Sequence, residues 1–228
     1  MRLLFILSFA PLLFSFKFNP MSQSIELAED QKSAQFTVEN DTPETMAIEL
    51  TVRERIMDDL GKEINPKVEG MTIFPPQMII PSKEKRTVRV TWNGGKVESE
   101  RAFRVIAEQL PLKVDEKTKR KSGIQMLMRY MAALYVNPKD SEPKISTLIQ
   151  KVTASELTLL VTNDGNKHQV LMKPTITFKK SDKKWTLKEN DLTGLAGENV
   201  LAKSKRIFTI KNSQQVSLDA ETSIKLDE

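Results

Sequence analysis

The chain has 228 residues, of which 39% are hydrophobic and 29% charged, and its formal net charge is +5. This composition is typical of a soluble globular protein with one large or two smaller domains, and it argues against a disordered chain or a membrane bundle. The sequence contains no cysteine. Disulfides, a thiolate nucleophile and cysteine-ligated metals are therefore excluded, and a substantial packed core must hold the fold.

The chain opens with "MRLLFILSFAPLLFSFKFNP", in which one basic residue precedes an apolar run that ends at Lys17. This run is shorter than the roughly 20 residues of a membrane-spanning helix. The pattern is typical of a secretory signal peptide. We therefore expect residues 1–17 to be a leader that is cleaved near Ser15, with no stable membrane insertion afterwards. An uncleaved anchor is the alternative.

Strand patterns dominate the first half of the chain after the leader. Four segments alternate apolar and polar residues with a period of two, and turn-prone pieces such as "NDTPE" and "WNGGK" lie between them. This spacing predicts an all-β sandwich. The four segments are "SAQFTVEN", "TMAIELTVRER", "EKRTVRVTW" and "AFRVIAEQLP".

The tract "YVNPKDSEPK", Tyr135 to Lys144, combines two prolines with short polar residues near the middle of the mature chain. Such a composition favours a linker between domains. The strand pattern resumes beyond it, first in "ELTLLVTNDGNKHQVLM" and then in "TITFKK", "KKWTL" and "RIFTI". The second half is therefore expected to form a second β domain.

The sequence offers no catalytic constellation and no metal or cofactor site. His168 is the single histidine and lacks the further ligands or oriented partner that zinc binding or acid–base catalysis requires. We expect it to be a polar residue at the surface or between domains, and Asp58 and Asp59 to lie in a solvated turn. The basic run Lys117 to Lys121 contains no interleaved aromatic residues, so it predicts a solvated loop and no nucleic-acid partner.

One stretch, "GIQMLMRYMAALYVNP", is apolar at both even and odd positions. A strand at the surface of a two-layer sandwich should have one apolar face only. Either the segment is a strand buried on both sides, or it is a helix, or one of its faces serves a partner. Its methionines suit the last role, because their flexible side chains adapt to different surfaces.

Together with its neighbours, this stretch resembles the periplasmic pilus-assembly chaperones of the PapD-like family. The resemblance rests on "FPPQMIIPSKEKRTVRV", "ERAFRVIAEQLP" and "LMRYMAALYVNP" in the first half, and on "LLVTNDGNKHQVL" and "LAGENVLAKSKRIF" in the second. The sequence looks most similar to the archaic, non-classical branch. The resemblance implies two immunoglobulin-like β-sandwich domains in a boomerang arrangement, residues 18–138 and 139–228, with a long loop over "KVDEKTKRKSG" before the seventh strand.

The resemblance also implies a function. Chaperones of this family act in the periplasm, complete fimbrial subunits by lending them a strand, and deliver them to an outer-membrane usher. Counting back from Pro138, the donor positions fall on the even-numbered residues Ile124, Met126, Met128 and Tyr130, and we expect the odd-numbered neighbours to face the chaperone's own sandwich or its rim. A secreted two-domain β-sandwich that serves adhesion or structure is the alternative.

The better-known branch of the family holds the carboxylate at the end of its subunit with two basic residues. In this sequence the corresponding positions are Ala133 and approximately Ser24, and neither is basic. We expect Arg89 and Arg104 to take over, since two antiparallel strands would bring them together at the cleft end of the first domain. Such a buried guanidinium could hold a carboxylate through charge-assisted hydrogen bonds.

Overall fold

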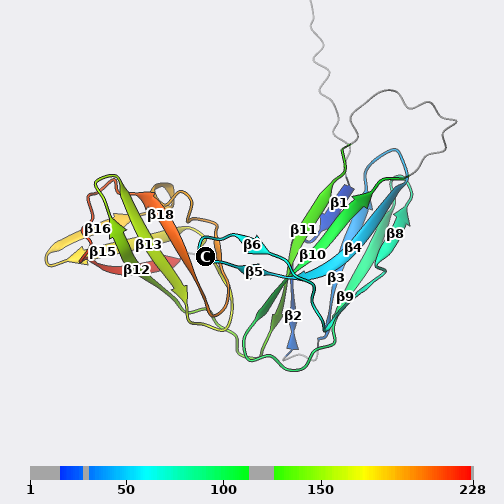
Figure 1. Ribbon diagram of the computed structural model, residues 1–228, viewed down its shortest axis with the longest axis horizontal. Coiled ribbons are helices and arrows are strands. Elements are labelled where there is room, and N and C mark those ends of the chain that lie inside the picture. Colours follow the sequence, from blue (N-terminus) through cyan, green and yellow to red (C-terminus); the bar gives the residue numbers. More distant parts are fainter. Residues whose placement is uncertain (1–15, 28–30, 113–125, 227–228) are drawn as a thin grey trace, which may run out of the picture.

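The chain forms two β-sandwich domains that meet at an angle (Figure 1). The computed structural model describes residues 16–27, 31–112 and 126–226. The loop expected over "KVDEKTKRKSG" and the residue Ile124 lie outside these ranges. Two separate clusters of buried apolar side chains, one in each domain, form the cores.

Two sheets make up the first domain. The first sheet contains, in spatial order, β1 (Phe16–Asn19), β3 (Ser33–Asn40), β9 (Lys85–Trp92) and β7 (Met71–Phe74). The second contains β2 (Ser22–Glu26), β11 (Arg129–Asn137), β10 (Arg101–Leu110), β4 (Met46–Glu54) and β8 (Gln77–Ile80).

The period of two in the sequence determines which side chains enter the core of this domain. In β3 the side chains of Phe36 and Val38 are fully buried, while the polar residues between core positions are exposed or only partly buried. In β10 the same holds for Phe103 and Val105, and the strand ends at Leu110, directly before Pro111. Each large apolar side chain that is buried in this way stabilises the fold by roughly 1.5–3 kcal/mol.

The second domain contains two three-stranded sheets and a short two-stranded one. The first consists of β12 (Ile145–Val152), β13 (Glu156–Asn163) and β18 (Ser204–Lys211), and the second of β16 (Lys183–Leu187), β15 (Pro174–Lys180) and β19 (Glu221–Leu226). The short sheet pairs β14 (Gln169–Val170) with β17 (Asn199–Val200), and a 3₁₀ turn covers Glu189–Asp191. Within the described ranges, no helix is long and apolar enough to cross a membrane.

The structure corrects two details at the edges of the first domain. Strand β11 continues to Asn137 and buries Tyr135, which is only 3% exposed, so the first three residues of the expected linker belong to a strand. At the other end, Phe16 begins β1 and is fully buried in the core. The fold therefore uses residues 16 and 17, which the expected leader included.

A hairpin that the sequence did not indicate reaches from the first domain to the second. It consists of β5 (Ile56–Met57) and β6 (Glu63–Ile64) and continues directly from β4 (Figure 1). The Asp58 side chain accepts hydrogen bonds from the backbone N–H groups of Leu60 and Lys62, at 3.0 and 2.8 Å, and so fixes the turn. The expected solvated turn is thus an ordered arm between the domains.

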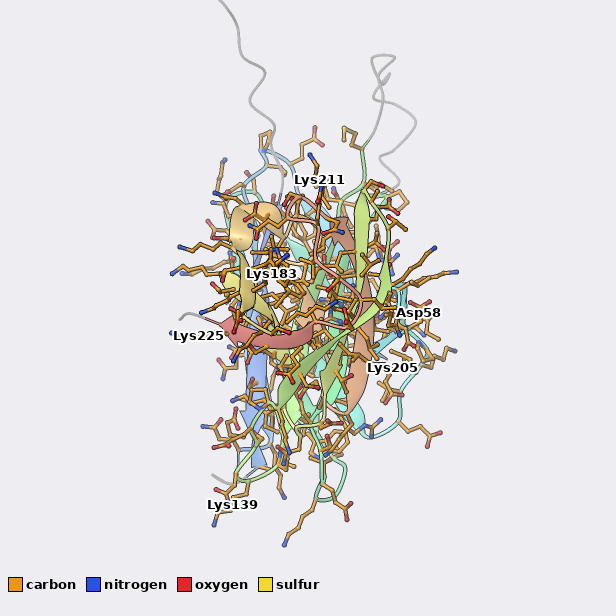
Figure 2. The ribbon with its side chains drawn as sticks, turned by 90° about the vertical axis from the view of Figure 1, so that its left-hand side faces the viewer. Asp58, Lys139, Lys183, Lys205, Lys211 and Lys225 are labelled. Atoms are coloured by element: carbon orange, nitrogen blue, oxygen red, sulfur yellow. The ribbon has the colours of Figure 1, made fainter. Side chains whose placement is uncertain are left out.

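The positive charge of the described residues is spread over the surface. The labelled lysines lie at separate positions around the molecule (Figure 2). One of them, Lys205 of β18, pairs with Asp59 of the hairpin at 3.2 Å, and both side chains are about half exposed. The net charge therefore does not form one basic patch in this part of the chain.

Candidate functional site

Strand β11 leaves half of one edge uncovered. Strand β2 pairs with it in parallel, but only from Ala133 to Asn137. On that edge, no other described strand pairs with residues 129–132, while β10 covers the opposite edge along almost the whole strand. The first half of β11 therefore lies at an edge of the sheet that no described strand completes, and sheet edges are sites where a further strand can add.

The even-numbered side chains of β11 and of the segment before it share one face. Leu134 and Val136 are fully buried in the core of the first domain, and Met128 and Tyr130 pack partly buried against the same core. Met126, further out, is 71% exposed. The sequence-predicted donor positions thus begin as core residues and leave the domain towards the N-terminal end of the segment.

The odd-numbered residues were expected to face the chain's own sandwich or its rim, and those before Met131 do not enter the core. Arg129 points outward and lies 3.6 Å from the Glu108 carboxylate, with both side chains about half exposed. Leu127 is 46% exposed. The reason is the register with β10, which aligns Leu134 with Phe103 and Ala132 with Val105, because paired residues point to the same face of a sheet.

The odd face of β11 is apolar for a different reason, since its later part lies against the second domain. The Tyr135 ring stacks on the His168 ring, with centroids 3.7 Å apart and an interplanar angle of 10°. His168 Nδ1 in turn lies 2.6 Å from Oε2 of Glu100 in the first domain. His168 is thus a polar residue between the domains. The even face of β11 packs in the core of the first domain, and the later part of its odd face contacts the second domain.

Basic residues gather on this outer face of the second sheet. Arg104 of β10 is the cross-strand neighbour of both Ala133 in β11 and Arg53 in β4, and Ala133 is the neighbour of Ser22 in β2. These four residues form one row across the sheet. The row contains Ala133, for which the family resemblance implied a basic residue, and it has arginine on the next two strands, β10 and β4.

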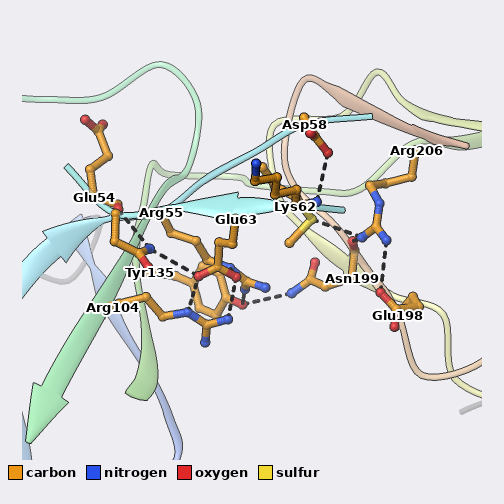
Figure 3. A network of polar contacts seen from close by, with 12 residues as sticks. Glu54, Arg55, Asp58, Lys62, Glu63, Arg104, Tyr135, Glu198, Asn199 and Arg206 are labelled. Atoms are coloured by element: carbon orange, nitrogen blue, oxygen red, sulfur yellow. Dashed lines mark hydrogen bonds and ion pairs between the residues drawn. The ribbon is translucent and has the colours of Figure 1, made fainter. Parts of the chain in front are cut away.

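A carboxylate from the hairpin holds this cluster together (Figure 3). Glu63 accepts two hydrogen bonds from Arg104, at 2.6 Å from Nε and 2.7 Å from Nη2, and a third from Arg55 Nε at 3.0 Å. Arg55 also donates from Nη1 to the Tyr135 hydroxyl at 3.0 Å, and Asn199 of the second domain donates to the same oxygen at 2.9 Å. Residues from both domains therefore meet at one polar centre.

The pKa values of the cluster follow from burial and charge. Burial raises the pKa of Glu63, but hydrogen bonds from Arg104 and Asn65 and the charges of the arginines outweigh it and lower this pKa to about 2. The hydrogen bond to Glu63 raises the pKa of Arg104 against the effect of desolvation. Burial raises the pKa of Tyr135. The ion pair is therefore fully charged near neutral pH, and the tyrosine is a neutral hydroxyl.

Arginines outnumber acids in this cluster. Arg53 is partly buried and has no ion pair or hydrogen bond from its side chain among the described residues. Arg55 and Arg104 share the single carboxylate of Glu63, and Arg53 is the cross-strand neighbour of Arg104. A partly desolvated site with excess guanidinium charge attracts an anion, and the planar donor pattern of arginine matches a carboxylate.

The expected pairing of Arg89 with Arg104 is wrong. Arg89 lies on β9 in the first sheet and is exposed between the core residues Val88 and Val90, whereas Arg104 lies on β10 in the second sheet. Their side chains point away from the core on opposite outer faces of the sandwich. The two strands are consecutive on the way from Lys85 to Leu110, but the chain changes sheet between them.

Sequence reasoning missed Arg53, Arg55 and Glu63. Arg53 of β4 and Arg55, directly after the strand, both alternate with its core positions, and this pattern predicts a shared orientation. Glu63 gave no signal, because β6 has only two residues. Among the described residues, no group of three or more histidine or acidic side chains could hold a metal ion.

Comparison with known proteins identifies the family. The model of the pili and flagellar-assembly chaperone PapD N-terminal domain matches residues 17–142, which is more than half of the chain. The chain belongs to this family. A comparison with curated proteins found no match.

Solved structures of PapD-like fimbrial chaperones resemble nearly the whole molecule. The class 5 fimbriae chaperone CfaA is 17% identical, with a TM-score of 0.62 over 94% of this chain and 99% of its own. A second match is a complex of the chaperone CsuC with the tip adhesion subunit CsuE, from the archaic chaperone-usher Csu pili of Acinetobacter baumannii. Its sequence identity is 17% and its TM-score 0.59, over 85% of this chain and 89% of the matched chain. At these identities the likeness establishes the fold, which is the expected pair of immunoglobulin-like sandwiches.

Proposed function

We propose that this PapD-like protein is a periplasmic chaperone that captures fimbrial subunits by donor-strand complementation and delivers them to an outer-membrane usher. The observation that carries the proposal is the uncovered edge of β11, which continues into an exposed apolar segment in a member of a pilus-chaperone family. A subunit that lacks one strand of its sandwich exposes an apolar groove and unpaired edge amides. The β11 edge offers what such a subunit lacks.

Backbone hydrogen bonds along residues 126–132 supply affinity that does not depend on the subunit's sequence, and alternate side chains fill its groove. Met126 is free to enter a subunit, and Ile124 is the next position on the same parity. Met128 and Tyr130 already touch the chaperone's core. In the complex they would join the core of the subunit to that of the chaperone, because the same face of one strand serves both.

The arginine cluster is the proposed anchor for the carboxylate at the end of the subunit. Arg104, with Arg53 and Arg55 beside it, takes the role that the sequence predicted for Arg104 and Arg89. The position of Arg104 along the sheet suits this role, because its cross-strand neighbour is Ala133 of β11, the strand that would pair with the subunit. An anchor at this point would fix the register of the subunit on β11.

Export completes the proposal. Cleavage of the leader after Ser15 would leave Phe16, the first core residue of β1, at the start of the mature chain. The expected division into residues 18–138 and 139–228 would then shift at its first boundary by two residues. The second boundary falls in the crossing between β11 and β12.

The chaperone should copurify at one to one with a small pilin-like subunit encoded beside it.

The donor segment provides the decisive test, because its exposed neighbours Met126 and Leu127 point to opposite faces. Met126→Asp should reduce the soluble subunit in coexpression by at least about tenfold, since a charge would enter an apolar groove. The chaperone should keep its melting temperature, because Met126 is 71% exposed.

Leu127→Asp is the matched control. Leu127 is 46% exposed, so this variant should also fold, but its side chain points away from the groove and capture should be retained. Equal loss of capture in both variants would contradict the donor-strand assignment. An adhesion or structural module, the alternative from another class, would bind no pilin-like subunit in the first place.

A further inference from the structure

We propose that Glu63 is an internal competitor at the anchor: its carboxylate occupies the edge of the Arg104 guanidinium that a subunit's terminal carboxylate would use, and so weakens capture of that carboxylate. The inference rests on the proposed function and concerns the same site. It assigns to the β5–β6 hairpin the role of limiting how tightly a subunit is held.

The geometry of the ion pair is that of a bound carboxylate ligand. Both oxygens of Glu63 accept from the Nε–Nη2 edge of Arg104, at 2.6 and 2.7 Å, which is the bidentate arrangement that arginine makes with free carboxylates. Oε2 also accepts from Arg55 Nε at 3.0 Å. Glu63 therefore already occupies three of the donors that the two arginines present.

Electrostatic repulsion prevents the Glu63 carboxylate and the subunit's terminal carboxylate from binding Arg104 together, or weakens the binding of each. A second carboxylate that approached Arg104 would lie within a few ångströms of Glu63, and like charges at this distance repel strongly in a partly desolvated site. Only 20% of the Glu63 side chain and 18% of the Arg104 side chain are exposed, so water screens this repulsion little. Neutralising Glu63 should therefore raise the affinity for an anion.

The position of Glu63 on a short hairpin favours displacement of its side chain from Arg104 by an incoming carboxylate. Arg53 and Arg104 lie on long central strands, while Glu63 lies on a hairpin with two paired positions, Met57 with Glu63 and Ile56 with Ile64. The backbone of this hairpin is held at its turn and at its tip, so displacement would move the Glu63 side chain and not the arm. Arg53, directly opposite Arg104, is available to the incoming carboxylate.

The test uses the mature full-length chain and a peptide probe, acetyl-Val-Ser-Val-Thr-Val-Tyr, with either a free carboxylate or a C-terminal amide. Dissociation constants are measured by NMR titration. Glu63→Gln should bind the acid peptide about tenfold more tightly than the wild type, as expected when one close like charge is removed. The amide should bind both proteins equally. Arg104→Gln should abolish the preference for the acid.

Glu54→Gln is the control, because it also removes a carboxylate from an arginine, in this case Arg101 at 2.6 Å, outside the cluster. It should leave acid binding unchanged. Equal or weaker binding of the acid by Glu63→Gln would overturn the inference, since it would make Glu63 a residue that positions Arg104. This result is separate from failure of the proposed function, in which the wild-type chain would hold no pilin-like subunit.

Discussion

Glu63 combines two opposing tendencies in one side chain. Burial favours its protonated form, while two arginines and Asn65 favour the carboxylate, and the second group prevails. The same charge that makes the arginine pair stable in the free protein limits what the pair can bind. Stability and affinity are therefore coupled at this residue.

The coupling predicts a pH dependence. The pKa of Glu63 is lowered from 4.5 to about 2, so its ion pair contributes fully above pH 4.5 and is lost as the pH falls towards 2. Unfolding free energy, measured by urea titration from pH 7 to pH 2, should fall less steeply over this range in Glu63→Gln than in the wild type. Parallel curves for the two proteins would show that the ion pair contributes nothing to folding.

The sequence indicated one residue of this site and not the others, for physical reasons. Arg104 belongs to a strand with a clear period of two, so its outward direction followed from its neighbours. Its partner could not be found in the same way, because the alternation of a strand does not say to which sheet the strand belongs. A pairing of Arg89 with Arg104 requires the consecutive strands β9 and β10 to be neighbours in one sheet. In this fold they belong to different sheets.

At the scale of elements, the β5–β6 hairpin connects the site to the second domain. The Ile207 N–H donates to the Asp59 carbonyl at 2.6 Å, so the tip of the hairpin bonds to the edge of β18. Arg206, only 5% exposed, donates from Nη1 to Met57 Sδ and to the Asn199 carbonyl, at 3.0 and 2.9 Å (Figure 3). The position of Glu63 thus depends on contacts that its own domain does not make.

Gly61 at the hairpin turn allows this approach. Its φ is +87°, which favours glycine, and a Cβ at this position would overlap the Arg206 guanidinium. Gly61→Ala should therefore destabilise the arm, which trypsin cleavage after the exposed Lys62 would report as faster proteolysis by about tenfold or more. Gly194→Ala is the matched control, since its φ is +89° and nothing lies within 4 Å of the added methyl.

Equal proteolysis at Lys62 in the two glycine variants and the wild type would show that the arm does not depend on close contact with Arg206. The hairpin also marks the limit of sequence-based prediction at this scale. Long strands such as β3 and β10 were predicted because burial imposes a period of two over eight or ten residues. Strands of two residues carry no period, and the contacts that accompany β5 and β6 include contacts to the second domain.

At the scale of the whole molecule, polar contacts connect two independent apolar cores. The resemblance to two-domain chaperones indicated this division, and the core residues of each domain followed from strand alternation. The contacts between the domains did not, because they involve isolated residues far apart in the sequence, such as Glu100 with His168 and Tyr135 with Asn199. These contacts set the angle at which the second domain lies beside the donor strand.

Two polar contacts between the domains, Glu100 with His168 and Lys205 with Asp59, differ in burial and should differ in effect. The Glu100 side chain is 1% exposed, and its carboxylate accepts from both the ring and the backbone N–H of His168, at 2.6 and 3.1 Å. Removing the His168 ring leaves the buried Glu100 side chain without one of its hydrogen-bond partners, which costs roughly 1–3 kcal/mol. The Lys205–Asp59 pair is about half exposed, and such pairs contribute about 0–1 kcal/mol.

His168→Ala should therefore loosen the angle between the domains, while Lys205→Ala should not. Small-angle X-ray scattering should show a larger radius of gyration for His168→Ala only, and its unfolding should separate into two transitions, because each domain retains its own core. Subunit capture should weaken in the same variant, since Asn199 of the second domain donates to the Tyr135 hydroxyl, which also accepts from Arg55. A His168→Ala protein with an unchanged radius of gyration would place control of the angle in the hairpin contacts to β18 instead.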